Sequence, residues 1–275
     1  MRIFEITLFG ATFGPTWYGL MYALAFGAAW ALLTWRGPFS KKQLDDLIFW
    51  GLVGVVLGGR LGYVLIYNLP YFLENPGEIL MPWKGGMSFH GGLMGVITVM
   101  LVLARKWNMS FWRVADACAW VTPVGILLGR IGNYVNGELL GWKGYTGPLA
   151  VVRDGVSYFP TPLLEAGLEG ILLFAVTSFA YFRWARSSSS LRGEECLGGI
   201  PSKGDVAIHA IPPGRTALLF MAGYAVARFT AEFFRDPDPQ VGYLLWGWVT
   251  AGMGLSFLMI AIAAALAVWA RPKSA

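Results

Sequence analysis

Long apolar stretches follow one another along almost the whole chain, and short segments between them carry most of the charges. A helix needs about 20 apolar residues to cross a hydrocarbon layer roughly 30 Å thick, and stretches of that order recur here without alternating charged faces. The pattern predicts an all-α, polytopic membrane protein with seven transmembrane helices. These are expected at residues 17–35, 47–67, 89–104, 114–128, 163–182, 216–234 and 243–270.

The connection between the fourth and fifth predicted helices shows two local patterns. The fourth span is short and runs into a stretch rich in glycine and asparagine, which predicts that the helix ends there or re-enters within the protein. Further on, residues 149–153 and 156–159 flank Asp154 and Gly155, a pair typical of a type I′ turn. We therefore predict that residues 129–162 form a loop with a small β-hairpin as its head.

Lysine and arginine are unevenly distributed between alternate connections. Thirteen lie in one set and six in the other, and the remaining two, Arg60 and Arg228, lie inside spans. Cytoplasmic loops carry the excess of basic residues, so the N-terminus is predicted outside and the C-terminus in the cytoplasm. The loop at 129–162 then faces outwards. Residues 186–215 are rich in serine, glycine and charge, and are predicted to form a flexible cytoplasmic loop.

Composition supports this class. The 275 residues are 56% hydrophobic and 13% charged, so no separate water-soluble core is expected, and residues 1–275 form a single integral membrane domain. The net charge of +5 reflects the uneven loops and affinity for anionic lipid, with no nucleic acid as a partner. Cys118 lies in a span and Cys196 in a cytoplasmic loop, which indicates neither a disulfide framework nor a cysteine nucleophile.

Glycines recur at four-residue spacing inside three spans. This spacing favours close packing of helices. The glycines concerned are Gly54, Gly58 and Gly62, then Gly91 and Gly95, then Gly125 and Gly129.

Charged residues inside apolar spans need a partner or a function, because each costs about 2.5 to 3.5 kcal/mol at the bilayer centre on insertion scales. Those that stand out are Arg60, Asp116, Arg228 and Glu232. Tyr224, Arg228, Glu232 and Arg235 follow at steps of four, four and three, which places them on one face of a helix. Either Arg228 and Glu232 neutralise each other within the bundle, or this face belongs to a polar site.

The segment GRIGNYVNGELLG, residues 129–141, offers Arg130, Asn133, Asn136 and Glu138 among four glycines. Exposed backbone N–H groups, amides and a guanidinium group could surround an anion such as phosphate. The alternative is a re-entrant loop in which the asparagines close turns.

Groups from distant parts of the chain are expected at one membrane level. Counting along helices of alternating direction places five of them near the outer surface, namely Tyr18, Arg60, His90, Arg130 and Arg228. This convergence predicts a polar site at the outer side.

Five segments of the chain resemble, in order, those of the bacterial prolipoprotein diacylglyceryl transferases. They are WYGLMY (17–22), GGRLGYVLIYN (58–68), GGMSFHGGLMGV (85–96), GRIGNYVNGELLG (129–141) and EFFRDPD (232–238). The resemblance implies an integral protein of the bacterial inner membrane, with its active site on the outer side.

The resemblance also implies an activity. The family transfers the diacylglyceryl group of phosphatidylglycerol to the thiol of the lipobox cysteine in a prolipoprotein signal peptide. A thioether forms and glycerol 1-phosphate leaves, without a cofactor, as the first step of lipoprotein maturation.

The family's functional residues fall on matching positions of this sequence. The resemblance implies that Arg130 and Arg228 serve the lipid phosphate and that His90 is a candidate base. The other implied substrate-binding residues are Tyr18, Arg60, Tyr63, Asn133, Asn136, Glu138, Gly141, Tyr224, Glu232 and Arg235.

Two positions depart from the family pattern. Phe159 and Leu164 stand where many members have a histidine and a tyrosine, which speaks against a role for this segment.

Two other functions fit the sequence less well. A transporter would need polar residues in both halves of the membrane, and the cytoplasmic halves carry little beyond Asp116. Phosphoryl transfer would need clustered carboxylates with a divalent ion, and the carboxylates are scattered in sequence. One site histidine and scattered carboxylates are not a typical ligand set, so no metal is expected.

Overall fold

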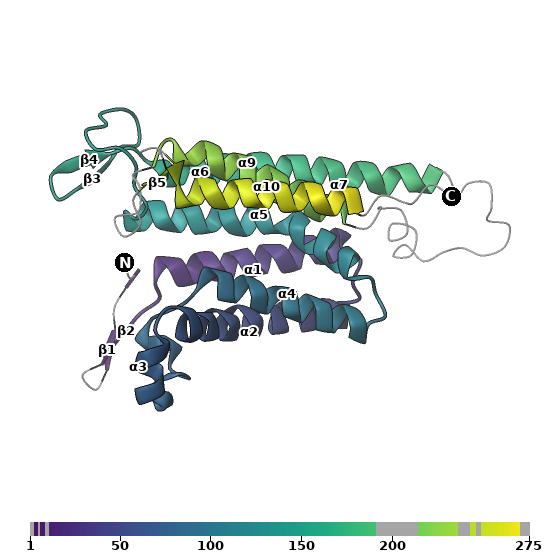
Figure 1. The fold of residues 1–275 in the computed structure, drawn as a ribbon, viewed down its shortest axis with the longest axis horizontal. Helices are drawn as coiled ribbons and strands as arrows, with labels where there is room; N and C mark the ends of the chain where they lie inside the picture. The colour runs from purple at the N-terminus through teal and green to yellow at the C-terminus, as the bar shows by residue number, and fades with distance from the viewer. Residues whose placement is uncertain are drawn as a thin grey trace. The chain divides into compact units, whose positions relative to one another are not determined.

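A computed structural model describes residues 3–4, 6–8, 11–190, 214–235, 243–245 and 249–269 (Figure 1). The described chain is mostly helical and divides into two compact units, one of residues 1–32 and 116–275 and the other of residues 33–115. The long helices are α1 (Trp17–Arg36), α2 (Lys41–Ile66), α4 (Phe89–Lys106), α5 (Phe111–Asn136), α7 (Leu173–Ser190), α9 (Arg215–Glu232) and α10 (Ala251–Trp269).

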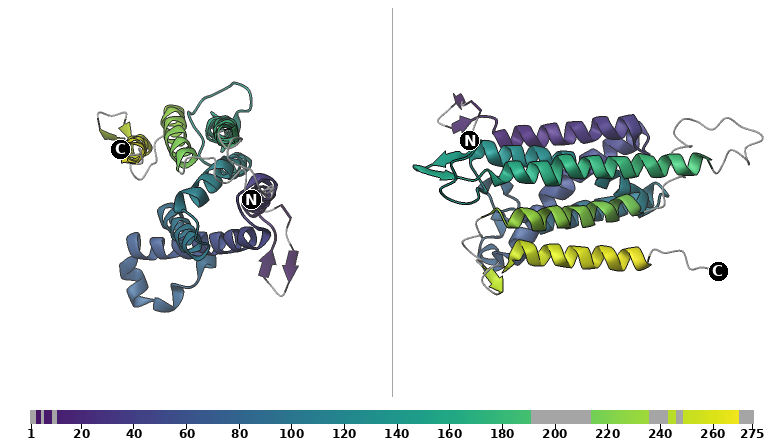
Figure 2. Two further views of the ribbon diagram at one scale, coloured as in Figure 1. Left: turned by 90° about the vertical axis from the view of Figure 1, so that its right-hand side faces the viewer. Right: turned by 90° about the horizontal axis from the view of Figure 1, so that it is seen from above.

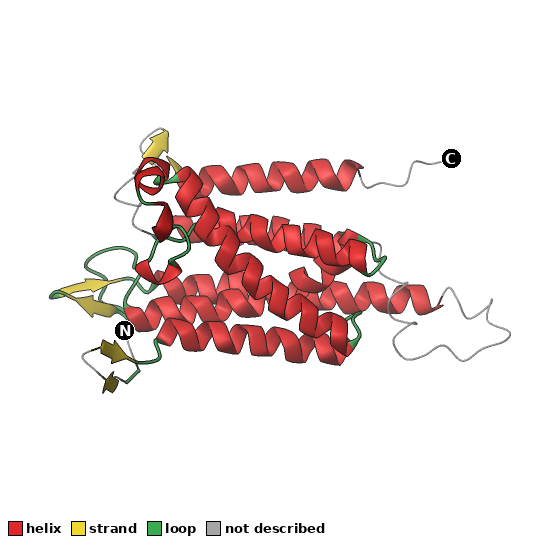
Figure 3. Ribbon diagram, turned by 90° about the horizontal axis from the view of Figure 1, so that it is seen from below, coloured by secondary structure: helices red, strands yellow, loops and turns green. Residues whose placement is uncertain are grey.

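Short elements connect these helices. The helical ones are α3 (Leu69–Glu74), two 3₁₀ turns (Pro76–Glu78 and Pro82–Lys84), α6 (Thr161–Glu165) and a π-helical segment, η3 (Ala166–Leu172). The strands form three antiparallel pairs, β1 (Ile6–Leu8) with β2 (Ala11–Phe13), β3 (Val151–Arg153) with β4 (Val156–Tyr158), and β5 (Tyr243–Leu245) with β6 (Val249–Thr250). All three pairs belong to the first unit and lie at the same end of its helices (Figure 3).

Five described segments are long and apolar enough to cross a membrane, which confirms the membrane-protein class. They are α1, α2, α4, α5 and the continuous helical segment Thr161–Arg183. In addition, α10 contains a shorter apolar helix, Gly252–Ala267. Within the first unit, α9 packs between α10 and α7 (Figure 2). The count of seven spans and their orientation stay predictions.

The prediction that the fourth helix ends or re-enters near residue 128 is wrong, because α5 continues to Asn136. Ile131 and Val135 keep the four-residue apolar spacing of a helix through the glycine-rich stretch. The helix ends where Gly137 adopts a φ of +67°, a left-handed conformation that glycine takes without steric cost. The backbone N–H groups of residues 129–136 are therefore inside a helix, and not exposed to an anion as predicted.

Two other predicted boundaries differ from the structure. The seventh predicted span starts at residue 243, but β5 pairs with β6 there and α10 begins only at Ala251. The side-chain oxygen of Thr250 accepts a hydrogen bond from the N–H of Met253 at 3.2 Å and so caps that helix. The fifth helix extends to Ser190, so the start of the predicted loop 186–215 is helical. Residues 191–213 of this predicted loop lie outside the described residues.

The predicted β-hairpin between the fourth and fifth helices is confirmed. Arg153 pairs with Val156 at its end, leaving a two-residue turn. Asp154 and Gly155 have φ values of 51° and 75°, and a type I′ turn requires positive φ at both positions.

In the second unit, glycines bring α2 and α4 into close contact, as predicted. A methyl group added at Gly58 would overlap the carbonyl oxygen of Gly91, and one at Gly95 would overlap that of Gly54. At Gly129, in the first unit, such a group would meet no described atom within 4 Å, so the close-packing prediction is wrong there.

Candidate active site

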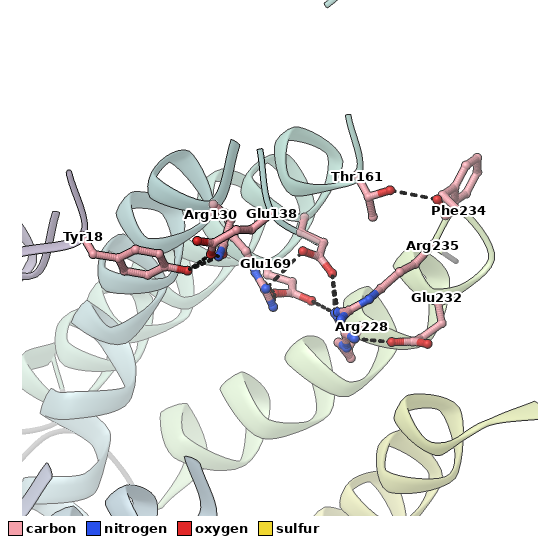
Figure 4. A network of polar contacts seen from close by, with 11 residues as sticks. Tyr18, Arg130, Glu138, Thr161, Glu169, Arg228, Glu232, Phe234 and Arg235 are labelled. Carbon is pink, nitrogen blue, oxygen red and sulfur yellow. Dashed lines mark hydrogen bonds and ion pairs between the residues drawn. The ribbon is translucent and has the colours of Figure 1, made fainter. Parts of the chain in front are cut away.

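Two arginines from different helices of the first unit meet at one carboxylate (Figure 4). Oε2 of Glu165 lies 3.1 Å from Nη1 of Arg130, and Oε1 contacts Nη1 of Arg228. Arg130 comes from α5, Arg228 from α9, and Glu165 ends α6. Glu165 therefore bridges the two guanidinium groups.

Each arginine also has a carboxylate of its own. Oε2 of Glu169 accepts hydrogen bonds from Nε and Nη2 of Arg130, at 3.2 and 2.9 Å. Nη2 of Arg228 contacts Oε1 of Glu232, whose Oε2 accepts a hydrogen bond from Thr250 at 2.7 Å. The expected pairing of Arg228 with Glu232 exists, but Arg228 binds Glu165 as well, so this pair does not neutralise itself in isolation.

The network is largely buried and its formal charges balance. The side chains of Glu165 and Glu169 are fully buried, whereas those of Arg130, Arg228 and Arg235 keep 15–18% exposure. With Glu232, three carboxylates face three guanidinium groups, and such pairing is what makes buried charges tolerable. The exposed part of the site is therefore the cationic part, which suits an anionic ligand.

The third arginine lies beyond the end of α9. Nη1 of Arg235 is 3.9 Å from Oε1 of Glu165, so all three guanidinium groups surround one carboxylate. Burial, followed by repulsion from Arg228, lowers the pKa of Arg235. An arginine keeps its proton in proteins nonetheless, and the site remains cationic on its exposed side.

The close approach of η3 to α5 explains why Glu169 reaches Arg130. A Cβ added at Gly170 would lie 2.9 Å from the Cα of Leu127, which only glycine avoids. The adjacent turns are π-helical, a conformation that is rare and often found at functional sites. Gly170 and the π-helical segment thus place two carboxylates against the arginines of the neighbouring helices.

A second polar cluster lies one helical turn beyond Arg130. The hydroxyl of Tyr18 donates to Oε2 of Glu138 at 3.0 Å, and Nδ2 of Asn133 donates to the same oxygen at 3.3 Å. Asn133 also contacts the Tyr18 hydroxyl. The turn at Gly137 directs Glu138 back towards α5, where its N–H donates to the carbonyl of Asn133 at 2.9 Å.

The chain matches one family along nearly its whole length. Residues 7–198 and 204–269 match the model of the family described as prolipoprotein diacylglyceryl transferase. The chain belongs to this family.

Individual members of the prolipoprotein diacylglyceryl transferase family confirm the match. The chain is 43% identical to the phosphatidylglycerol–prolipoprotein diacylglyceryl transferase of Hydrogenovibrio crunogenus, with 97% of this chain and 95% of the relative covered. It is 39% identical to the enzyme of that name from Pseudomonas paraeruginosa, with 94% and 90% covered. The one from Francisella tularensis subsp. holarctica is also 39% identical, with 92% and 87% covered.

In this diacylglyceryl transferase, the segment that contains Phe159 and Leu164 reaches the arginine network, and its expected lack of a role in the activity stays a prediction. It contributes Glu165 and the hydroxyl of Thr161, which donates to the carbonyl of Phe234 at 2.8 Å. The ring of Phe159 lies 5.7 Å from that of Phe234 and joins the loop to the end of α9. Leu164 precedes the bridging carboxylate directly.

Gly141 is a point of close approach in the same region. A Cβ there would overlap the carbonyl oxygen of Phe234 and the hydroxyl of Thr161. Its N–H donates to the carbonyl of Phe159 at 2.9 Å, and it bridges to Arg235. The structure thus gives Gly141 a packing role beside the arginines.

The remaining predicted residues of the first unit lie on elements of the network. Tyr224 precedes Arg228 by one turn of α9, and its ring stacks on that of Phe220 at 6.1 Å. Asn136 is the last residue of α5.

Three predicted site residues, Arg60, Tyr63 and His90, belong to the second unit. Arg60 is buried, and its guanidinium donates to backbone carbonyls, at 2.9 Å to Ile79 and 2.6 Å to Glu78. The structure therefore indicates that Arg60 holds the loop after α2. His90 is exposed in the first turn of α4. Its convergence with Arg130 and Arg228 stays a prediction.

The loop held by Arg60 has a polar cluster of its own outside the predicted spans. Glu78 accepts hydrogen bonds from Lys84 at 2.6 Å and from Tyr71 at 2.9 Å. These bonds hold the pKa of Glu78 below its usual value, and the bond to Glu78 raises the pKa of Tyr71. Tyr63 also packs against this loop, because a Cβ at Gly86 would overlap its ring.

Sequence reasoning missed Glu165 and Glu169. Both lie within an apolar span, four residues apart, and they meet the criterion that singled out Glu232. Their partners cannot be read from the sequence, because they depend on how η3 packs against α5. Across the described residues, no group of three or more His, Cys, Asp or Glu side chains could hold a metal ion.

Proposed function

We propose that this protein transfers the diacylglyceryl group of phosphatidylglycerol to the thiol of a lipobox cysteine in prolipoproteins. The observation that carries the proposal is the pair Arg130 and Arg228, held at one carboxylate, in a chain that belongs to the diacylglyceryl transferase family. Two guanidinium groups so arranged suit the phosphate of an anionic lipid.

The reaction is a substitution at the glyceryl carbon that carries the phosphate ester. The thiolate sulfur bonds to that carbon, the carbon–oxygen bond breaks, and glycerol 1-phosphate leaves with the bonding electrons. Negative charge grows on the departing phosphate, where Arg130 and Arg228 stabilise it. In other enzymes, loss of one such preorganised donor raises the activation barrier by on the order of 3 kcal/mol.

A base must accept the thiol proton, because a thiol with a pKa of about 8.5 is only a few per cent ionised at neutral pH. We assign this role to His90, which lies exposed in the first turn of α4. Tyr18, Asn133 and Glu138 form the polar wall one turn beyond Arg130. We assign further substrate-binding roles to Tyr224 and Glu232 on α9 and to Arg235 just beyond it.

The proposed setting is the bacterial inner membrane, with seven spans, the N-terminus outside and the site at the outer side. Tyr18 lies in the first turn of α1 and Arg130 near the end of α5. Glu165 follows the next loop, and Arg228 lies near the end of α9. Helices that run alternately up and down bring such positions to one level. A lipid and a precursor held by its signal peptide both reach this level by lateral diffusion.

The test uses protein purified in detergent, phosphatidylglycerol and a synthetic lipobox peptide. We expect the peptide mass to rise by one diacylglyceryl group and an equal amount of glycerol phosphate to appear. A peptide with serine in place of the cysteine should gain nothing. If folded protein leaves the cysteine peptide unchanged across several donor lipids, the proposal is wrong.

A further inference from the structure

The three carboxylates of the arginine network have different roles in the geometry. Glu169 binds Arg130 through two hydrogen bonds, and Glu232 binds Arg228 while it is itself held by Thr250. Glu165 places one oxygen in an ion pair with each of the two guanidinium groups, whereas the second ion pair of Glu169, to Arg228, is longer at 3.9 Å. Each arginine therefore keeps a carboxylate of its own if Glu165 gives way.

The carboxylate of Glu165 contacts the two arginines in the way that a phosphate group could. The two oxygens of a carboxylate and the two non-bridging oxygens of a phosphodiester both offer a pair of acceptors on one central atom. A carboxylate that spans Arg130 and Arg228 therefore holds them at a spacing that a phosphate group can also span.

Glu165 is fixed in place by its surroundings. It is fully buried, and the hydroxyl of Thr161 at the start of α6 donates to the carbonyl of Phe234, just beyond α9. On its other side, Gly170 of η3 lies against Leu127 of α5. The segment that carries Glu165 is thus anchored to both helices that carry the arginines.

Oε1 of Glu169 is also placed to take part in an exchange of partners. It is buried, it has no hydrogen-bond partner within the described part of the chain, and it lies 3.9 Å from Nη1 of Arg228. A small shift of Arg228 would give this oxygen a partner when Glu165 is released.

We propose that Glu165 is a positioning residue that acts as an internal counter-ion of Arg130 and Arg228, and that the phosphate of the donor lipid exchanges with it. The inference rests on the proposed function for the identity of the lipid. Glu165 holds the arginines at the spacing required for phosphate and competes with it, so that the product phosphate leaves again.

This exchange predicts an unusual kinetic result for Glu165→Gln. The variant keeps the shape of the side chain but removes its charge, so phosphate no longer competes with a carboxylate. We expect glycerol 1-phosphate to bind and inhibit about tenfold more tightly, the gain from removing one charge-assisted competitor. The KM for phosphatidylglycerol should fall, and kcat should fall about tenfold or more, because product leaves slowly and the arginines are less well spaced.

The experiment measures binding of glycerol 1-phosphate by calorimetry and inhibition in the peptide assay, for wild type and variant. Asp116→Asn is the matched control, since Asp116 is a buried carboxylate of α5 that accepts from backbone N–H groups of Gly214 and Ala217, at 2.7 and 2.8 Å. This control should lose thermal stability with unchanged KM and phosphate affinity. A purely structural role for Glu165 would give the same pattern as the control.

Each outcome decides the inference. Tighter phosphate binding with lower kcat supports it, whereas weaker or unchanged phosphate binding in folded Glu165→Gln overturns it. If that variant does not fold, Glu165→Asp replaces it, because its carboxylate is one methylene further from the arginines. Phosphate binding should then be tighter and kcat lower, as in Glu165→Gln, but both changes should be smaller. If wild type performs no transfer, the proposed function fails, and the calorimetric comparison still decides the role of Glu165.

Discussion

At the scale of single residues, Arg130 and Arg228 depend on planar, forked side chains. Each guanidinium group binds two carboxylates at once while part of it stays exposed. A lysine ammonium offers a point charge and cannot occupy two such directions with fixed geometry.

We therefore predict that Arg130→Lys and Arg228→Lys lose most of their turnover although the charge is kept. A loss on the order of 100-fold in kcat is expected, as for removal of one preorganised donor. Initial rates of peptide modification at saturating phosphatidylglycerol would measure it. Near-normal rates in both folded lysine variants would contradict the forked-clamp geometry.

His90 gives a separate prediction, because the proposed mechanism has it act on the thiol and not on the phosphate. His90→Ala should keep its KM for phosphatidylglycerol and retain part of its turnover. We expect kcat to fall about 100-fold, which is the lower end of the usual contribution of a general base. Added imidazole should restore part of that rate. Failure of imidazole to restore any activity, together with a raised KM, would place His90 in lipid binding instead.

At the scale of elements, the course of α5 shows what the sequence could and could not predict. Helices of alternating direction predict Tyr18, Arg130 and Arg228 at one level, and the structure brings Arg130 and Arg228 to one carboxylate and Tyr18 to Asn133. The extension of α5 to Asn136 was not predicted, since glycine and asparagine suggest a loop while Ile131 and Val135 continue a helix. Packing against neighbouring helices decides whether such a stretch forms a loop or continues the helix.

The carboxylates were missed for a related reason. An i, i+4 pair such as Glu165 and Glu169 indicates a shared helix face, but not which helix it meets. That depends on the π-helical segment and on the approach of Gly170 to Leu127, both products of tertiary packing. The hairpin β5–β6 was hidden similarly, because its residues are as apolar as the helix that follows.

The packing of α2 against α4 leads to a prediction about stability. Gly58→Ala places a methyl group onto the carbonyl oxygen of Gly91, and overpacking of this kind costs about 1–3 kcal/mol. We expect a lower midpoint of heat-induced aggregation in detergent. Gly51→Ala is the control, because the same helix has open space there. Equal midpoints for the two variants would mean that the close contact of α2 and α4 does not limit stability.

At the scale of the whole molecule, the proposed chemistry requires that the β3–β4 hairpin and the arginine site share the outer side. The hairpin is the next element after α5, and the network lies near the C-terminal ends of α5 and α9. One apolar segment, Thr161–Arg183, separates the hairpin from Cys196, which lies outside the described residues.

This separation can be tested with a thiol reagent that does not cross membranes. Val152 in β3 is 71% exposed, so Val152→Cys offers a reactive position, with Cys118→Ala in all variants to remove the cysteine of α5. In spheroplasts we expect Val152→Cys, combined with Cys196→Ser, to be labelled at once. The natural Cys196 should be labelled only after permeabilisation.

Two other results would carry different consequences. The reverse pattern would place the hairpin and the arginine site in the cytoplasm, on the wrong side for an exported precursor. Labelling of both positions in intact spheroplasts would mean that Thr161–Arg183 does not cross the membrane, although its length and apolar composition suit a crossing. Glu165 and Glu169 would still need their arginine partners in that case, because both side chains are fully buried within the protein itself. The labelling pattern therefore tests on which side of the membrane the hairpin and the arginine site lie.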